Sequence, residues 1–243
     1  NQVYSEKLIK WFYDRGISSD TMMKNRIAEG KEYMPQLGKE TTTIQFKYFR
    51  DSKLINVKYR DAAKNFKLVK DAERVMYGLD DLLGKKEVII VEGEMDKLAF
   101  YEAGYKNCVS VPNGASNLKM EYLKDFPEDL EKVYLAVDND EPGKKLQEEL
   151  SRRIGRDICY RVTYPDGCKD INDVLISYDS DVVKDCIVNA QSYPLEGVLN
   201  VNDFDVDIDT LYENGLDRGA TINHNSFDNL FSFASSQLTV ITG

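Results

Sequence analysis

Short apolar runs alternate with helical stretches from residue 85 onwards, and this alternation constrains the fold more than any other feature. Four runs have the length and the β-branched content of buried strands: EVIIV (87–91), CVSV (108–111), VYLAV (133–137) and ICYRV (158–162). Helical patterns lie between them, over 94–103, 117–125 and 141–153. Strands that helices connect in this way pair in parallel, so the sequence predicts an α/β fold with a mostly parallel sheet flanked by helices.

The first 82 residues follow a different pattern, which predicts a small α+β subdomain. The apolar positions of SEKLIKWFY (5–13) have helical spacing, and Ser5 is expected to cap this helix. A second short helix is expected to start near residue 18. The segment 41–60 is rich in Thr, Ile, Phe, Tyr and Val and has a turn signal at 51–53, which predicts a β-hairpin.

Charge is divided unevenly between these two parts. The whole chain has a net charge of −10, which at first argues against a nucleic-acid partner. Residues 1–70, however, contain 15 Lys and Arg against 8 Asp and Glu, a net charge of +7, so residues 71–243 account for −17. This asymmetry predicts a basic surface for a polyanion beside an acidic region that holds metal ions or faces solvent. Chance clustering is the alternative.

The remaining composition excludes several classes of protein. No window holds 18 consecutive apolar residues and no secretory leader is present, so neither a membrane span nor secretion is expected. The four cysteines, at 108, 159, 168 and 186, form no C-x-x-C pair. This spacing predicts a reducing compartment and no zinc site in this chain.

Acidic residues follow two of the predicted strands. Glu92 comes directly after 87–91, and Asp138 and Asp140 come after 133–137. The carboxyl ends of parallel strands meet at one edge of a sheet, so these side chains are expected to lie close together. Crowded carboxylates repel one another unless a divalent cation neutralises them, and oxygen donors suit Mg²⁺ or Mn²⁺ rather than zinc. The alternative to metal binding, for an isolated D-x-D, is that Asp138 lies in a turn and Asp140 caps a helix.

The joint pattern of apolar strand, E-G, about 45 residues, apolar strand and D-x-D-x-x-G resembles the Toprim family, the metal-binding fold of primases, topoisomerases and some nucleases. Four longer segments resemble the primase half of phage-type primase-helicases and of Twinkle helicases: VEGEMDKLAF (91–100), VPNGASNLK (111–119), VDNDEPGKK (137–145) and CKDINDVL (168–175). Upstream, KYRDAAKNFK (58–67) and MYGLDDL (76–82) resemble the basic subdomain before Toprim in those proteins. Downstream, 227–243 resembles the start of their helicase domain.

The resemblance implies a fold and a division of the chain. It implies a Toprim domain, which is Rossmann-like with a mostly parallel sheet, preceded by a small basic α+β subdomain. The predicted parts are a basic primase subdomain (1–82), a Toprim catalytic domain (83–192), and an acidic linker with the truncated start of a RecA-like helicase domain (193–243). The linker is expected either to dock on a neighbouring subunit of a ring or to be a flexible tether. A cytoplasmic location is expected for a bacterial or phage protein, and an organellar one for a eukaryotic protein.

The implied activity is that of a DNA primase core, which joins ribonucleoside triphosphates into a short RNA primer on a single-stranded DNA template. In this family the residues matching Glu92, Asp138 and Asp140 are catalytic and hold Mg²⁺ or Mn²⁺, and Asp170 matches a further acidic position of the metal site. The alternative for Asp170 is a helix cap before INDVL. The partner in the full-length protein would be a helicase domain that forms a hexameric ring.

Basic and small residues complete the site that the resemblance implies. Nucleotide or DNA binding is expected of Lys58, Arg60, Lys64, Lys67, Gly114, Ser116 and Lys119. For the basic run the alternative is a solvated face, and for 113–116 it is an ordinary turn with Ser116 as a cap. Core packing is expected of Trp11, Phe12 and Tyr13, with base stacking as the alternative.

Two departures from the family keep other functions open. The four-cysteine zinc module of phage primases is not in this sequence, and Asn113 stands where a His is expected. The second hypothesis is therefore a non-priming DNA-binding or assembly module of a Twinkle-like helicase. A Toprim nuclease ranks third, because 58–67 and the helicase-like segment have no place in one.

Overall fold

The computed structural model describes residues 4–114, 118–193, 204–215, 219–233 and 240. The chain divides after residue 194 into two units, which are described separately. Within the described ranges, no helix has both the length and the apolar character that crossing a membrane requires.

The first unit begins with two short helices and an antiparallel sheet. Helices α1 (Glu6–Tyr13) and α2 (Ser19–Lys24) precede four strands in the order β1-β2-β3-β4. The strands are β1 (Ala28–Met34), β2 (Lys39–Arg50), β3 (Lys53–Arg60) and β4 (Phe66–Leu68). The predicted hairpin is confirmed as β2 and β3, but β1 and β4 were not predicted. The two turn residues Asp51 and Ser52 both have positive φ, 51° and 61°, as a two-residue hairpin turn of the favoured twist requires.

The predicted cap of the first helix is also confirmed. The Ser5 hydroxyl accepts a hydrogen bond from the Leu8 amide at 3.2 Å, and Leu8 and Phe12 are buried. Ser18 caps α2 in the same way, since its hydroxyl accepts from the Thr21 amide at 3.2 Å.

The second sheet of this unit has five strands in the order β6-β5-β7-β8-β9. They are β5 (Glu87–Val91), β6 (Cys108–Ser110), β7 (Lys132–Leu135), β8 (Cys159–Arg161) and β9 (Gln191–Ser192). The first four pair in parallel, and β9 pairs antiparallel with β8. The predicted α/β class is therefore confirmed, with an antiparallel edge strand added.

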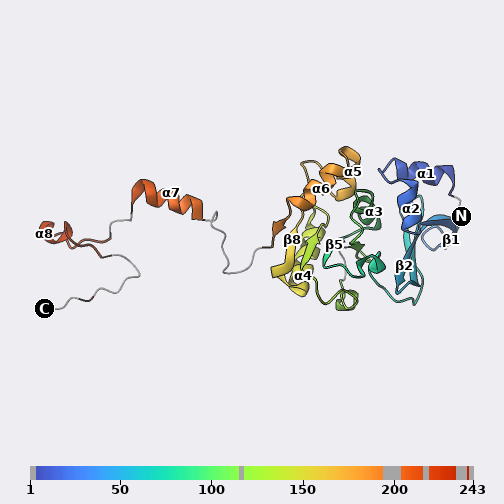
Figure 1. The fold of residues 1–243 in the computed structure, drawn as a ribbon, viewed down its shortest axis with the longest axis horizontal. Helices are drawn as coiled ribbons and strands as arrows, with labels where there is room; N and C mark the ends of the chain where they lie inside the picture. The colour runs from blue at the N-terminus through green and yellow to red at the C-terminus, as the bar shows by residue number, and fades with distance from the viewer. Residues whose placement is uncertain (1–3, 115–117, 194–203, 216–218, 234–239, 241–243) are drawn as a thin grey trace. The chain divides into compact units, whose positions relative to one another are not determined.

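Helices cover both faces of this sheet (Figure 1). α3 (Glu94–Glu102), α5 (Ile171–Ser177) and α6 (Ser180–Val188) lie on one side, and α4 (Glu141–Ile154) lies on the other. The crossover from β5 to β6 runs in the opposite direction along the sheet to that from β7 to β8. Right-handed crossovers in opposite directions place their helices on opposite faces.

Short 3₁₀ helices fill three of the connections: η1 (Leu79–Leu82), η2 (Met120–Tyr122) and η3 (Arg156–Ile158). The prediction of a helix over 117–125 is wrong for the residues described there, which form only the single turn η2. Tyr122 is buried, and Leu123 and Phe126 pack against the core from this non-helical backbone, so tertiary packing overrides the helical spacing of the sequence.

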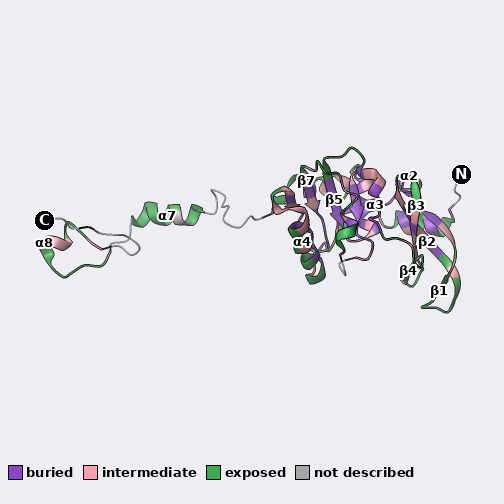
Figure 2. Ribbon diagram, turned by 90° about the horizontal axis from the view of Figure 1, so that it is seen from below, coloured by how far each residue is buried: buried purple, intermediate pink, exposed green. Residues whose placement is uncertain are grey.

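One hydrophobic core joins the two sheets of the first unit. Phe46 and Tyr48 of β2 belong to the same buried cluster as Tyr77 and Leu98, and the buried residues run continuously through β5 and α3 in Figure 2. The buried ammonium of Lys97 adds polar contacts, since it donates to Asp81 at 2.6 Å and also to Asn25. Both sheets thus form one compact unit, within which the boundary between residues 82 and 83 stays a prediction.

The second unit is small and mostly exposed where it is described. It contains α7 (Asp205–Asn214) and α8 (Asn225–Asp228), and residues Ala220 and Phe233 pair with each other. α7 is exposed along the length that Figure 2 colours. α7 ends at Asn214, and of residues 234–243 only Val240 is described.

Candidate active site

Glu92 and Asp138 lie together at the carboxyl edge of the parallel sheet. Each follows one of the neighbouring strands β5 and β7, and the Asp138 amide donates to Glu92 Oε1 at 3.1 Å. The first turn of α4 approaches this pair through Gly143. A Cβ atom there would overlap the Asp138 carbonyl oxygen and lie 2.7 Å from Glu92 Oε1, so only glycine fits.

Asp140 and Asp170 both cap helices, which is the alternative to metal binding that the sequence predicts for each. Asp140 Oδ1 accepts from the Gly143 amide at 2.9 Å at the start of α4, and this bond holds the pKa of Asp140 below its usual range. Asp170 Oδ1 accepts from the Asp173 amide at 2.8 Å at the start of α5. Capping by one oxygen leaves the second oxygen of each carboxylate for another partner.

Lys169 supplies the positive charge at this edge. Its ammonium lies 2.7 Å from Asp138 Oδ2 and 3.3 Å from Asp140 Oδ2, so it bridges the two aspartates of the D-x-D motif. The Lys169 carbonyl also accepts from the Asn139 amide at 2.8 Å, which fixes the two loops against each other. Sequence reasoning did not single out Lys169.

Asp96 is a second residue that sequence reasoning missed. It lies one helical turn after Glu92 and is only 8% exposed. Burial, and then the charges of Asp170 and Asp138, raise the pKa of Asp96 well above its usual range. The available signal was a second acidic residue in the first turn of α3, four residues after Glu92.

Glu92 and Asp170 also retain protons more readily than usual. Burial, followed by the charges of Asp138 and Asp140, raises the pKa of Glu92 to about 7. Burial also raises the pKa of Asp170. The negative charge of the cluster is therefore incompletely compensated by the protein itself.

The donor set at this edge fits a hard divalent cation. We call the five carboxylates the acidic edge; they are Glu92, Asp96, Asp138, Asp140 and Asp170. All their donors are oxygen. Burial raises the pKa values of Glu92 and Asp96, and the charges of neighbouring carboxylates, which a cation would neutralise, raise them further. As they stand, no three such side chains of the described chain converge on one point as a finished ligand set, and Lys169 bridges two of them.

A cleft of about 570 Å³ joins the acidic edge to the antiparallel sheet. β3 and β4 contribute Lys58, Phe66 and Lys67 to its lining, and Glu92 and Asp138 face them. Lys58 is held by Glu94, whose Oε1 lies 2.8 Å from the ammonium and also accepts from the Tyr48 hydroxyl. Glu94, which is 5% exposed, is thus the residue that positions Lys58, and sequence reasoning missed it.

The other predicted binding residues are only partly gathered in this cleft. Lys67 lines it and forms an ion pair of 2.5 Å with Glu32, and Gly114 lines it from the loop after β6. Lys64 and Lys119 are exposed and lie outside its lining. Ser116 lies outside the described residues.

Arg60 lies beyond the rim of the cleft, stacked on Trp11. Its guanidinium carbon is 4.5 Å from the centre of the Trp11 ring, and that of Arg15 is 3.8 Å away. Burial, and then the charge of Arg15, lower the pKa of Arg60, whose Nε has no hydrogen-bond partner within the described chain. Arg60 is also 5.8 Å from the ring of Phe66, which does line the cleft. Trp11 therefore packs against Phe12 while holding two cations near this rim.

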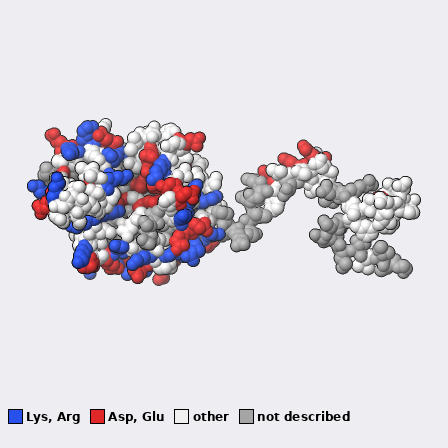
Figure 3. Space-filling view, turned by 180° about the vertical axis from the view of Figure 1, so that it is seen from behind, with Lys and Arg blue, Asp and Glu red and all other residues white. Residues whose placement is uncertain are grey.

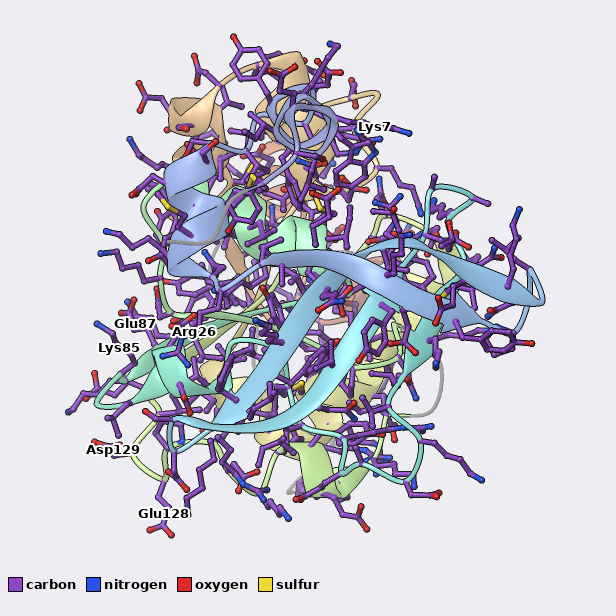
Figure 4. The ribbon with its side chains drawn as sticks, turned by 90° about the vertical axis from the view of Figure 1, so that its right-hand side faces the viewer. Lys7, Arg26, Lys85, Glu87, Glu128 and Asp129 are labelled. Atoms are coloured by element: carbon purple, nitrogen blue, oxygen red, sulfur yellow. The ribbon has the colours of Figure 1, made fainter. Side chains whose placement is uncertain are left out.

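The basic charge of the first 70 residues is not gathered on one bare face. On the face drawn in Figure 3, Lys and Arg side chains are mixed with Asp and Glu. Figure 4 shows Lys7 of α1 pointing outward at one side of the molecule, with Glu128 and Asp129 at the opposite side. The two basic residues that line the cleft are themselves ion-paired, as described above.

Comparisons with known proteins agree with this architecture. Residues 86–164 match the family model described as a Toprim domain. The Twinkle homolog protein, chloroplastic/mitochondrial, of Arabidopsis thaliana is 35% identical over 98% of this chain and 36% of its own length. The primase homolog protein of the same plant is 35% identical over 79% of this chain and 61% of its own length. The chain thus spans between about a third and three fifths of these relatives.

Among solved structures, the primase fragment of the bacteriophage T7 primase-helicase protein matches with a TM-score of 0.57 and 25% identity, over 72% of each chain. The fold and the acidic edge define a protein that contains a Toprim domain. Within that class, the resemblance to the primase part of phage-type primase-helicases and Twinkle proteins is confirmed.

Proposed function

We propose that this chain is the primase core of a replicative primase-helicase, which makes short RNA primers on single-stranded DNA by metal-dependent nucleotidyl transfer. One observation carries the proposal: the cleft places the cations Lys58 and Lys67 opposite the carboxylates Glu92 and Asp138. Its volume of about 570 Å³ is that of a site for a nucleotide-sized ligand. The similarity to the T7 primase fragment supports the same reaction.

Mg²⁺ or Mn²⁺ would be held by the acidic edge, in which Glu92, Asp96 and Asp138 line the cleft and Asp140 and Asp170 lie outside its lining. When bound, the cation would stabilise the negative charge that develops on the oxygens of the transferring phosphoryl group. Gly143 lets the first turn of α4 lie directly against Glu92 and Asp138.

The protein's own side chains have distinct tasks in this proposal. Lys58, fixed by Glu94, and Lys67 bind the phosphates of a ribonucleoside triphosphate in the cleft. Glu92, which lines the cleft, accepts the proton of the attacking 3′-hydroxyl. Arg60 and Arg15 bind template phosphates beyond the rim, next to Trp11.

The larger assembly is also part of the proposal. The relatives of this chain are longer proteins, and one is a Twinkle homolog. A helicase domain that forms a hexameric ring is the expected partner of this core. The location follows the host, being organellar in a eukaryote, as the name of that relative states for the plant protein, and cytoplasmic otherwise.

Incorporation of labelled ribonucleotides on single-stranded DNA tests the proposal directly. The unmodified chain should form labelled oligoribonucleotides with Mg²⁺, and Glu92→Gln should reduce the rate by roughly 100-fold or more. Lys145→Gln, on the exposed side of α4, is the control and should keep the full rate.

Three outcomes of that experiment would count against the proposal. Equal signal from the unmodified chain and Glu92→Gln would remove the catalytic assignment. Absence of product from a protein that still binds single-stranded DNA would favour a non-priming module of a Twinkle-like helicase. Cleavage of the template would favour a nuclease.

A further inference from the structure

A small pocket of about 80 Å³ lies at the edge of β2 and shares no lining residue with the cleft. β1 pairs with β2 only as far as Gln45, so within the described chain the second half of β2 has no neighbouring strand on that side. Lys47 and Phe49 line the pocket from this free edge. Lys24 and Arg26 line it from the end of α2 and the turn that follows. No role has been given above to any of these side chains.

Three cations of this pocket lack the close partners that Lys58 and Lys67 have in the cleft. In the ranges that the structure describes, no carboxylate forms an ion pair with Arg26 or Lys47. The ammonium of Lys24 is 3.9 Å from Asp20, and both side chains are more than half exposed. Such a long and exposed pair contributes little, so all three cations are available to an anionic ligand.

The carboxylates of the lining do not cancel this charge. Asp81 accepts from the buried Lys97 ammonium at 2.6 Å, and Asp80 accepts from the Ser52 amide at 3.0 Å. The lining thus contains four cations against two carboxylates and is positive overall. Lys97 also donates to the side chain of Asn25, which is itself buried, so the residue before Arg26 is anchored in the core.

Arg26 has a backbone conformation that a residue with a Cβ atom seldom adopts. Its φ is 55°, in the left-handed region. Its amide donates to the Met23 carbonyl at 3.0 Å, and the Ile27 amide donates to the Met22 carbonyl at 3.0 Å. These two bonds form a Schellman motif at the end of α2, and glycine is the usual residue at the position of Arg26. An arginine there points to a use for its side chain beyond the turn itself.

The Arg26 side chain is stacked on Phe49. Its guanidinium carbon is 4.2 Å from the centre of the Phe49 ring. Stacking of this kind fixes the plane of the guanidinium and leaves the N–H donors at its edge for an oxygen ligand. Arg26 is exposed and lies at the outside of the molecule in Figure 4, so a ligand can reach these donors from solvent.

The size of the pocket limits the ligand to a single small anionic group. Whole nucleotides and drug-sized molecules occupy sites of about 300–1,000 Å³, so 80 Å³ admits a phosphate group but neither a base nor a sugar. The planar donors of arginine and the point charge of lysine both suit phosphate oxygens.

The openness of the three cations to solvent favours a phosphate that belongs to a strand. Solvated cations hold a free phosphate weakly, but a strand bound elsewhere on the protein presents further phosphates at a high effective concentration. A lysine on a free sheet edge also opposes pairing with another chain, but that role requires no arginine in a left-handed conformation nearby.

We propose that Lys24, Arg26 and Lys47 form a second contact for the sugar-phosphate backbone of single-stranded DNA. The choice of this strand rests on the proposed function, in which Arg15 and Arg60 make the first contact; the binding itself requires no primer synthesis. Contacts to phosphates carry no sequence information, so this edge contact would lengthen the bound segment of the template without selecting its sequence.

Fluorescence anisotropy of a labelled oligothymidylate, in buffer without divalent cations or nucleotides, measures this contact. Lys47→Gln should weaken binding by the unmodified chain roughly 3-fold, and the slope of log affinity against log salt should decrease by about 0.7, the value of one phosphate on a single strand. Lys145→Gln removes the same charge from the exposed side of α4 and should leave the affinity and the slope unchanged.

Arg26→Gly separates DNA binding from a structural role of Arg26. Glycine suits the left-handed φ, so the midpoint of urea denaturation should equal or exceed that of the unmodified chain. DNA binding should nevertheless weaken roughly 10-fold, because a charge-assisted contact is lost. If the midpoint and the affinity both fall, Lys47→Gln, which leaves this turn intact, decides the outcome.

Several results would overturn the edge contact. They are absence of oligothymidylate binding by the unmodified chain, an unchanged affinity in Arg26→Gly and Lys47→Gln, and an equal loss in Lys145→Gln. A loss confined to duplex DNA would overturn the assignment to a single strand. ATP, titrated by calorimetry, should bind equally to Arg26→Gly and the unmodified chain, and weaker binding to the variant would make the pocket a nucleotide site instead.

Primer synthesis separates this proposal from the proposed function. If Arg26→Gly and Lys47→Gln weaken DNA binding as expected but the unmodified chain incorporates no ribonucleotides, the edge contact stands and the primase assignment fails. If synthesis occurs and neither variant changes DNA binding, the edge contact fails alone.

Discussion

The two sides of the cleft differ in how far their charged side chains are neutralised by partners within the protein. On the side of β3 and β4, Lys58 and Lys67 already have carboxylate partners at 2.8 and 2.5 Å. On the side of β5 and β7, the five carboxylates of the acidic edge share one cation, Lys169, which reaches only Asp138 and Asp140. The basic side is therefore complete as a folded structure, whereas the acidic edge is complete only with further positive charge.

This difference shows which side chains are already held in place before any ligand binds. Buried ion pairs lock Lys58 in place, so the basic side is preorganised before any ligand arrives. On the acidic edge, burial and then the charges of neighbouring carboxylates raise the pKa values of Glu92 and Asp96. Perturbed titration of this kind is typical of functional sites.

The largest effect on stability is expected from Gly143→Ala, which would displace α4 from the acidic edge. The added Cβ would overlap the Asp138 carbonyl oxygen, so α4 must shift. We expect a loss of about 4 kcal/mol in the free energy of unfolding, measured by urea denaturation. Gly84→Ala is the control: Gly84 has a φ of 66° and open space around it, so it should lose only about 1 kcal/mol. Equal losses would show that the close approach of α4 is unimportant.

Lys58→Met tests the completeness of the basic side. It leaves the carboxylate of Glu94 buried with only the Tyr48 hydroxyl, which should cost about 3 kcal/mol in urea denaturation. Lys64→Met removes the same charge from an exposed loop and should change stability by less than about 0.5 kcal/mol. If Lys58→Met is as harmless as Lys64→Met, the basic side is not preorganised by its ion pairs.

Lys169→Met tests whether the Lys169 ammonium competes with a divalent cation at the acidic edge. Lys169 lies against two of the carboxylates and competes with a divalent cation, so its removal should raise the affinity for Mn²⁺ roughly 10-fold. Electron paramagnetic resonance of free Mn²⁺ measures the change. Lys119→Met, far from these carboxylates in sequence and exposed, is the control and should leave the affinity unchanged. Weaker binding by Lys169→Met would mean that the ammonium supports the cation site.

The pH dependence of stability gives the smallest expected effect. The pKa of Glu92 is about 7 in the folded protein, above the ordinary value of 4.5. The folded state therefore binds an extra proton, and stability present below about pH 4.5 is lost as the pH rises through 7. In EDTA, the loss between pH 5 and pH 8 should be on the order of 1 kcal/mol after solvent screening.

Glu92→Gln is the matched variant for this dependence. The glutamine oxygen still accepts from the Asp138 amide but carries no charge, so part of the decline between pH 5 and pH 8 should disappear. If the stability of Glu92→Gln declines as much as that of the unmodified chain, burial and Asp138 do not raise the pKa of Glu92.

Much of the fold could be predicted from the sequence because its signals are local. The apolar strands β5 and β7, the cap at Ser5 and the start of α4 behind Asp140 follow from patterns within a few residues. Strand β4 has only three residues, and its pairing with β3 depends on tertiary packing. The prediction of a helix at 117–125 was wrong for the same reason, because tertiary packing determines the backbone conformation there.

The site was less predictable than the fold. Glu92 and Asp138 were identified because strand order alone brings them together. Asp96, Glu94 and Lys169 were missed because their importance depends on burial and on partners distant in sequence, such as Tyr48 and Lys58 for Glu94. Conversely, the basic run appeared uniform in sequence, but its members separate into paired, stacked and exposed side chains.

Titration of the unmodified chain with Mn²⁺, followed by electron paramagnetic resonance, tests the central claim that the acidic edge takes up a divalent cation. Binding should be saturable, displaced by Mg²⁺, and weakened about 10-fold or more by Asp138→Asn, with Asp181→Asn as an exposed control that changes nothing. The account is contradicted if Asp138→Asn and the control bind Mn²⁺ as the unmodified chain does.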